Sequence, residues 1–178
     1  MTETVTQLNF LLALSTIFMQ LGVVVLTYLF FFERDSAFLK LIGKYGIPVA
    51  FLLSLGGLLL SLLYSEVFGF VPCGLCWLQR VFLYPQVILF GIALFKKETY
   101  IADYVIGLSL VGSVVALYQH YLQMGGTELL GCPVVGAGAD CAKRILFEFG
   151  YITFPLMSFS VFILTIALMI LVKKTTKS

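Results

Sequence analysis

Five long apolar runs, separated by short polar segments, make up most of the chain. A helix needs roughly 20 mostly apolar residues to cross the hydrocarbon layer of a membrane. The runs predict membrane-spanning helices near residues 8–32, 46–70, 77–95, 100–124 and 151–172. The strands of a membrane β-barrel would instead show about 10 residues in which apolar and polar side chains strictly alternate. The pattern therefore predicts an all-α membrane protein with five spans.

Composition narrows the class of protein further. Of the 178 residues, 61% are hydrophobic and 11% charged, whereas a soluble domain carries about 25% charged residues. This excludes an ordinary soluble globule and leaves one polytopic membrane unit without a separate soluble domain. The net charge of +2 gives no dense basic surface, so no nucleic-acid partner is expected.

The basic residues predict how the chain is oriented. Eight of the eleven follow the first, third and fifth spans, and the positive-inside rule assigns them to the cytoplasm: Arg34, Lys40, Lys44, Lys96, Lys97, Lys173, Lys174 and Lys177. The C-terminus is then cytoplasmic. The N-terminus, the turn at 69–76 and the segment 125–150 lie on the opposite side, together with all four cysteines. Because residues 1–7 contain no Lys or Arg, the first run is predicted to be a retained span and not a signal peptide.

The first cysteine pair stands at the predicted start of the third span. Pro72 suits a helix start because its missing N–H would be unpaired there anyway, which puts Cys73 and Cys76 in or just before the first turn. The free N–H groups at that end favour a thiolate. Two cysteines separated by two residues can also close a small, reducible ring. The pair is therefore predicted to cycle between dithiol and disulfide.

Arg80 follows Cys76 by four residues, so both lie on the same helix face. A guanidinium just inside the membrane is costly unless it has an anionic or strongly polar partner. A Cys76 thiolate or an oxygen of a reduced quinone could be this partner. The alternative is that Arg80 extends to lipid phosphate, as many arginines near span ends do.

The second pair, Cys132 and Cys141, lies in the predicted outer loop with eight residues between the cysteines. The glycines at 136 and 138 make a flexible loop that a disulfide can close with little strain, and an exposed loop disulfide is easily attacked. The alternative is that Cys132 and Cys141 form a permanent structural disulfide. The long and uneven spacing of the four cysteines argues against a metal site. Trp77 stands where a c-type haem attachment would require His.

A Pro-Cys-x-x-Cys-x-x-x-Arg signature at a helix start, followed two spans later by a second cysteine pair, resembles the disulfide bond formation protein B family (DsbB and its BdbC-type relatives). The resemblance covers about residues 45–172. It implies a four-helix bundle in the bacterial plasma membrane that reoxidises an extracytoplasmic, DsbA-like thioredoxin-fold protein and passes the electrons to a membrane quinone, ubiquinone or menaquinone. Residues 1–44 are then an extra N-terminal helix with a cytoplasmic loop. Residues 45–178 form the DsbB-like domain, with its cysteine loop at 125–150.

The resemblance also implies a role for each matched residue. Cys132 would be attacked by the partner's thiol, and Cys141 would be its partner in the loop. Cys73 would receive electrons from the loop pair. Cys76 would be the thiolate beside the quinone, and Arg80 would lie at the quinone as well.

Two further positions bear on the quinone site. His120 sits where the family tends to carry a histidine close to the quinone, although a packing role is the alternative. Gln79 stands where many relatives have an acidic residue before the arginine. Two other functions remain open at this point: a vitamin K epoxide reductase-like protein, in which the loop pair precedes the CxxC, and a non-enzymatic membrane protein with structural disulfides. The order of the pairs in this chain favours the DsbB resemblance.

Overall fold

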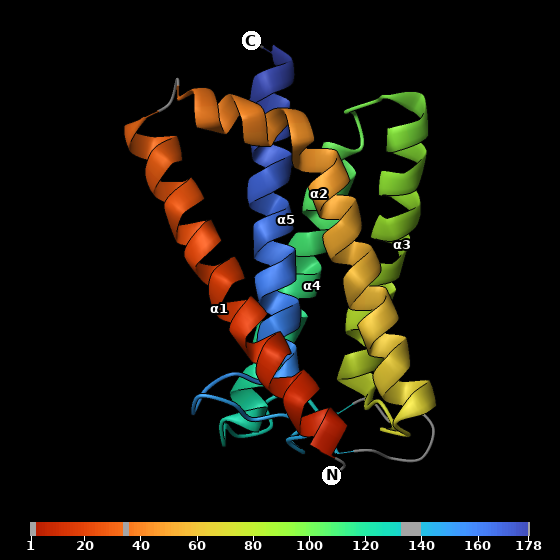
Figure 1. Ribbon diagram of the computed structural model, residues 1–178. Coiled ribbons are helices and arrows are strands. Elements are labelled where there is room, and N and C mark those ends of the chain that lie inside the picture. The colour runs from red at the N-terminus through yellow and green to blue at the C-terminus, as the bar shows by residue number, and fades with distance from the viewer. Residues whose placement is uncertain (1–2, 34–35, 133–139, 178) are drawn as a thin grey trace.

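The chain folds into a bundle of long helices, seen in the computed structural model of Figure 1. The structure describes residues 3–33, 36–132 and 140–177. Within them, five helices are long and apolar enough to cross a membrane, which confirms the predicted fold class. The helices are α1 (Glu3–Phe32), α2 (Ala37–Leu62, continued by the π-helical turn η1, Leu63–Val67), α3 (Gly74–Lys96), α4 (Ala102–Gln123) and α5 (Phe154–Lys177).

α2 begins earlier than the sequence predicts, at Ala37 instead of near residue 46. Lys40 and Lys44, expected in a cytoplasmic loop, therefore lie within the helix. The Ser36 side chain caps it by accepting a hydrogen bond from the Phe38 N–H at 3.3 Å. Figure 1 shows α2 running first across one end of the bundle and then turning down into it. Pro48 inside the helix accounts for such a bend, because proline has no N–H and its ring clashes with the carbonyl four residues before.

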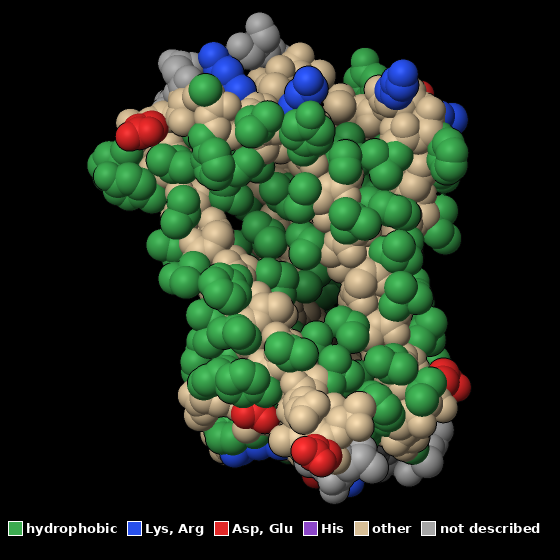
Figure 2. Space-filling model, viewed as in Figure 1, with side chains coloured by type: hydrophobic (Ala, Val, Ile, Leu, Met, Phe, Trp, Pro, Cys, Tyr) green, Lys and Arg blue, Asp and Glu red, His purple; other side chains and the backbone are tan. Residues whose placement is uncertain are grey.

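The two ends of the bundle differ in charge. The N-terminus and the α4–α5 connection lie at one end, and the C-terminus lies at the other (Figure 1). Lys and Arg side chains gather over the C-terminal end, and a broad apolar belt covers the flank below it (Figure 2). A belt of this kind matches the hydrocarbon thickness that the helices can span.

α5 is the central helix and packs closely on α4. A Cβ atom added at Gly112 of α4 would come within 2.6 Å of the Phe162 ring of α5, so the missing side chain lets these two helices approach. α1 leans against α5 at the N-terminal end of the bundle. Ala13 of α1 packs there in a cluster with Leu146, Ile152 and Leu156.

Candidate active site

The CxxC pair lies at the first turn of α3, as predicted. Cys73 is the N-cap residue, and its sulfur accepts a hydrogen bond from the Cys76 N–H at 3.4 Å. The two sulfur atoms are 2.8 Å apart and are not joined by a disulfide. The contact with the Cys76 sulfur, together with burial, raises the pKa of the Cys73 thiol above its ordinary value. Cys73 therefore holds its proton more tightly than an ordinary cysteine does.

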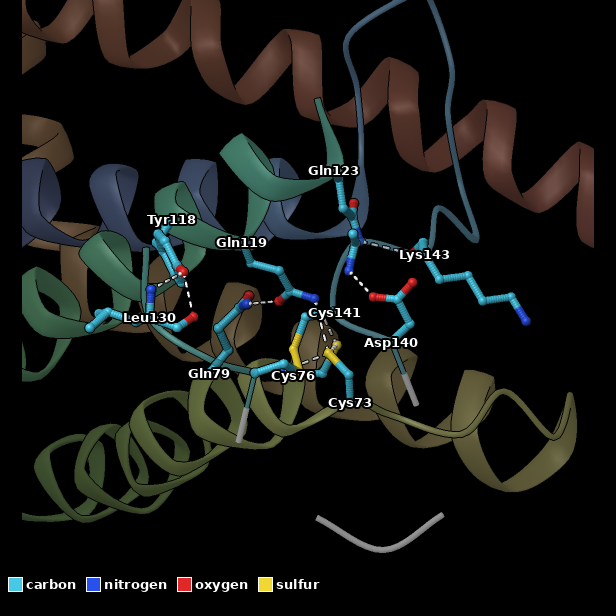
Figure 3. The surroundings of a disulfide bond; sticks show 12 residues. Cys73, Cys76, Gln79, Tyr118, Gln119, Gln123, Leu130, Asp140, Cys141 and Lys143 are labelled. Atoms are coloured by element: carbon cyan, nitrogen blue, oxygen red, sulfur yellow. Dashed lines mark hydrogen bonds between the residues drawn. A yellow bond between two sulfur atoms is a disulfide. The ribbon is translucent and has the colours of Figure 1, made fainter. Parts of the chain in front are cut away.

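A buried glutamine from α4 is directed at both sulfurs. The Gln119 side-chain amide donates to Cys73 Sγ at 3.1 Å and to Cys76 Sγ at 3.2 Å. Gln79 of α3 donates to Gln119 Oε1 and so fixes which end of the amide faces the sulfurs. Figure 3 shows this chain of side chains running from α3 through α4 to the cysteines. The arrangement favours a thiolate because the amide N–H donates to the sulfur, and a hydrogen bond to the charged form stabilises it.

Cys132 and Cys141 form a disulfide, with their Cα atoms 6.0 Å apart. This confirms the pairing. The expectation of an exposed loop pair is wrong for one of its members, because Cys141 is 0% exposed whereas Cys132 is partly exposed. Cys141 packs in one cluster with Cys73, Leu75 and Leu122, beside the CxxC pair (Figure 3). The glycines at 136 and 138 lie outside the described residues.

Hydrogen bonds to Tyr118 and Gln123 hold the cysteine loop on the end of α4, and they explain this burial. The Tyr118 hydroxyl donates to the Leu130 carbonyl at 2.6 Å and accepts from the Leu130 N–H at 2.8 Å. Gln123 donates to the Lys143 carbonyl at 3.1 Å. Both arms of the loop are thereby tied to one helix, which brings the disulfide against Cys73.

A cavity of about 400 Å³ lies on the other side of the CxxC pair. Its walls come mainly from α1, α2, α3 and α5, with Gln119 from α4, and are largely apolar; the surface is hollowed between α1 and α2 in Figure 2. Its polar end includes Cys76, Gln79, Arg80 and Gln119. Cys73 is not among the lining residues. The two cysteines of the CxxC pair thus differ in their surroundings: both contact the cluster that holds Cys141, but the cavity is lined by Cys76 and not by Cys73.

Arg80 is 8% exposed and lies on the wall of this cavity. Its guanidinium donates to the Ser61 carbonyl of α2 at 2.8 Å and lies over the Trp77 ring, 5.0 Å from the ring centroid. The guanidinium therefore has protein partners and does not extend toward lipid phosphate. A guanidinium has five N–H donors, and the bond to Ser61 uses one of them.

His120 is placed away from this site. Its Nδ1 lies 2.9 Å from the Thr153 hydroxyl, and it is not among the cavity-lining residues. The adjacent Gln119 faces the sulfurs instead. The sequence does carry a signal for this, since Gly112, Ala116, Gln119 and Gln123 recur at helical spacing as a small and polar stripe, and all four are buried. A glutamine in such a stripe within a membrane helix marks a polar contact.

Comparison with known proteins agrees with this geometry. The family model described as disulfide bond formation protein DsbB matches residues 44–172. The chain belongs to the DsbB family. It is therefore a disulfide formation protein, a membrane thiol oxidoreductase. The family match thus agrees with the DsbB resemblance, in which the CxxC pair precedes the loop pair, and not with a vitamin K epoxide reductase-like protein.

Individual DsbB-family relatives extend the match. The chain is 36% identical over 113 residues to disulfide bond formation protein C of Bacillus subtilis, which covers 64% of this chain and 81% of the relative. It is 42% identical over 108 residues to the SPbeta prophage-derived disulfide bond formation protein B of the same organism, covering 61% and 72%. A probable disulfide formation protein of Chlamydia trachomatis is 34% identical over 137 residues, covering 77% and 98%. No solved structure matches significantly.

Proposed function

We propose that this DsbB-family protein reoxidises an extracytoplasmic, DsbA-like thioredoxin-fold protein and delivers the electrons to a membrane quinone. The observation that carries the proposal is the position of the CxxC pair between two different neighbours. Cys73 packs against the loop disulfide on one side, and Cys76 borders an apolar cavity on the other. This is the arrangement that a two-stage electron relay requires.

The first stage is exchange at the loop. A thiolate of the partner attacks Cys132, the more exposed sulfur, and Cys141 leaves as a thiolate. The partner's second thiol then displaces Cys132, so the partner departs with a disulfide and the loop is left with two reduced cysteines. Attack occurs through the thiolate and requires access to the sulfur attacked, which is why the buried Cys141 is assigned the leaving role.

The second stage moves the electrons inward. With the CxxC pair oxidised, the Cys141 thiolate attacks Cys73, beside which it packs, and Cys76 leaves as a thiolate. Cys132 then displaces Cys73, which re-forms the loop disulfide and leaves Cys73 as a thiol. The hydrogen bond from Gln119 to Cys76 stabilises the departing thiolate. The net change so far is the transfer of two electrons from the partner's dithiol to the CxxC pair, which then holds a thiol on Cys73 and a thiolate on Cys76, while the second proton of the dithiol is released.

The cavity residues fit a quinone. A quinone is an apolar ring with two carbonyl oxygens, and when bound it supplies an acceptor for two electrons and two protons. The apolar walls suit the ring, and Arg80 and the Gln119 amide supply donors at the end where Cys76 lies. An always-charged guanidinium also stabilises negative charge developing on an oxygen. Oxidation of Cys76 with Cys73 closes the cycle.

The proposed location is the bacterial plasma membrane, with the N-terminus and the cysteines outside and the C-terminus in the cytoplasm. The basic side chains at the C-terminal end support this orientation. An extracytoplasmic site also suits stable disulfides, since such compartments are oxidising.

Quinone turnover tests the proposal. The purified, fully reduced protein is freed of reductant and mixed with ubiquinone-1, and quinol is measured by the loss of quinone absorbance. The expected result is about two quinols per protein as both cysteine pairs oxidise, since each disulfide releases two electrons. Pairs that stay reduced in the presence of excess quinone would overturn the proposal.

A further inference from the structure

α1 lies outside the region that the DsbB family model matches, so family membership gives it no function. The family model matches residues 44–172, and the relative from Chlamydia trachomatis is covered over 98% of its length by 77% of this chain. α1 (Glu3–Phe32) lies before the matched region. It nevertheless contributes directly to the cavity that reaches Cys76.

The cavity-facing residues of α1 form one stripe. Leu12, Ser15, Thr16 and Met19 line the cavity, and their spacing of three, four and seven residues is that of a single helix face. Leu11 and Phe18, beside the stripe, are 60% and 66% exposed. α1 therefore presents one face to the cavity and another to the surrounding lipid.

Two polar side chains of α1, one beyond each end of the stripe, fix this face in position with three hydrogen bonds. Tyr64, itself a cavity residue, donates a hydrogen bond to the buried Asn9 side chain. Beyond the other end, Gln20 donates to the Ser160 hydroxyl at 3.2 Å and accepts from the Tyr151 hydroxyl at 3.2 Å. Hydrogen bonds between helices hold orientation in a membrane, where apolar packing alone gives little preference over lipid. The stripe is thus held toward the cavity.

We infer that α1 is a wall of the acceptor site, and that Leu12 and Met19 help to determine which quinone it accepts. The inference rests on the proposed function. Without this wall, the cavity beside Cys76 would face lipid acyl chains on that side. With it, the ring of the acceptor is enclosed between α1 and the helices that carry Arg80 and Gln119. The size of the side chains at positions 12 and 19 then limits the size of the ring.

Substitution of Met19 tests the inference in the full-length protein. Met19→Trp fills the cavity from α1, and Phe18→Trp is the matched control because it adds the same ring one residue away on the lipid face. Met19→Trp is expected to raise the KM for ubiquinone-1 about tenfold or more, since overfilling a packed site costs about 1 to 3 kcal/mol. The control is expected to match the wild type. Reduction of the loop disulfide by dithiothreitol is expected to be unchanged in both, which shows that the fold is intact.

A smaller side chain provides a second, opposite test. Met19→Ala enlarges the cavity, so the ratio of kcat/KM for menadione, a two-ring quinone, to that for ubiquinone-1 is expected to rise, and in Met19→Trp it is expected to fall. The inference is overturned if the KM and this ratio in both Met19 variants equal those of Phe18→Trp while the wild type turns over quinone. A wild-type protein that reduces neither quinone would instead overturn the proposed function.

Discussion

Gln119 provides a quantitative prediction about the redox behaviour of the CxxC pair. It is 1% exposed, donates to both sulfurs, and is itself held by Gln79. Replacement by leucine removes these donors while keeping a side chain of similar size. In the proposed relay the reduced pair carries a thiolate on Cys76, and this charged form loses more stabilisation than the neutral disulfide does. Gln119→Leu is therefore expected to make the pair less oxidising.

The size of the effect follows from the hydrogen bonds lost. A hydrogen bond to a charged group contributes about 1.5 to 3 kcal/mol. For a two-electron couple, about 1.4 kcal/mol corresponds to 30 mV. The reduction potential of the CxxC pair is therefore expected to fall by about 30 to 60 mV, and its equilibrium constant for reduction by dithiothreitol by about tenfold to a hundredfold.

The assay isolates the CxxC pair in a Cys132→Ser, Cys141→Ser background. The protein is equilibrated in dithiothreitol buffers of graded potential, and its free thiols are counted by maleimide mass shift. Leu117→Met, a lipid-facing change on the same helix at a residue 49% exposed, is the matched control. A Gln119→Leu potential within about 10 mV of that control, well below the shift expected from one charged hydrogen bond, would show that the amide does not stabilise the thiolate. Retained helicity by circular dichroism excludes unfolding as the cause of a change.

Two further predictions concern the two ends of the relay. Arg80→Ala is expected to raise the KM for quinone by about tenfold or more, because one charge-assisted contact is lost. The rate of exchange between the partner and Cys132 is expected to stay within twofold of the wild-type rate. An unchanged KM and kcat for quinone would show that Arg80 does not belong to the acceptor site. Cys141→Ser, mixed with the disulfide form of a thioredoxin-fold partner, is expected to trap a mixed disulfide that is seen on a non-reducing gel, because the Cys132 thiolate breaks the partner's disulfide and no Cys141 remains to displace the partner. Trapping through Cys73 with Cys132 free would reverse the proposed order.

The sequence predicts the spans and the position of the CxxC pair because both depend on local properties. Span number follows from the length of apolar runs, and the start of α3 follows from Pro72 and the cysteine that caps the helix. The start of α2 is missed because lysines at a membrane boundary are compatible with a helix as well as a loop. Ser36 provides the cap, and no proline intervenes before Pro48.

Which residue of α4 faces the cysteines is not a local property. Gln119 and His120 are adjacent, so they point about 100° apart on the helix, and the rotation of α4 is set by its packing on α5 at Gly112. The burial of Cys141 likewise depends on the contacts of Tyr118 and Gln123 with the two arms of the loop. Such tertiary contacts leave no periodic pattern at the cysteines themselves.

The most direct test of the central claim asks which cysteine pair passes electrons to quinone. Two purified variants, Cys132→Ser with Cys141→Ser and Cys73→Ser with Cys76→Ser, are fully reduced, freed of reductant and mixed with ubiquinone-1. The relay predicts about one quinol per protein from the variant that keeps the CxxC pair, and none from the variant that keeps only the loop pair. Quinol from the loop-pair variant alone would contradict the account.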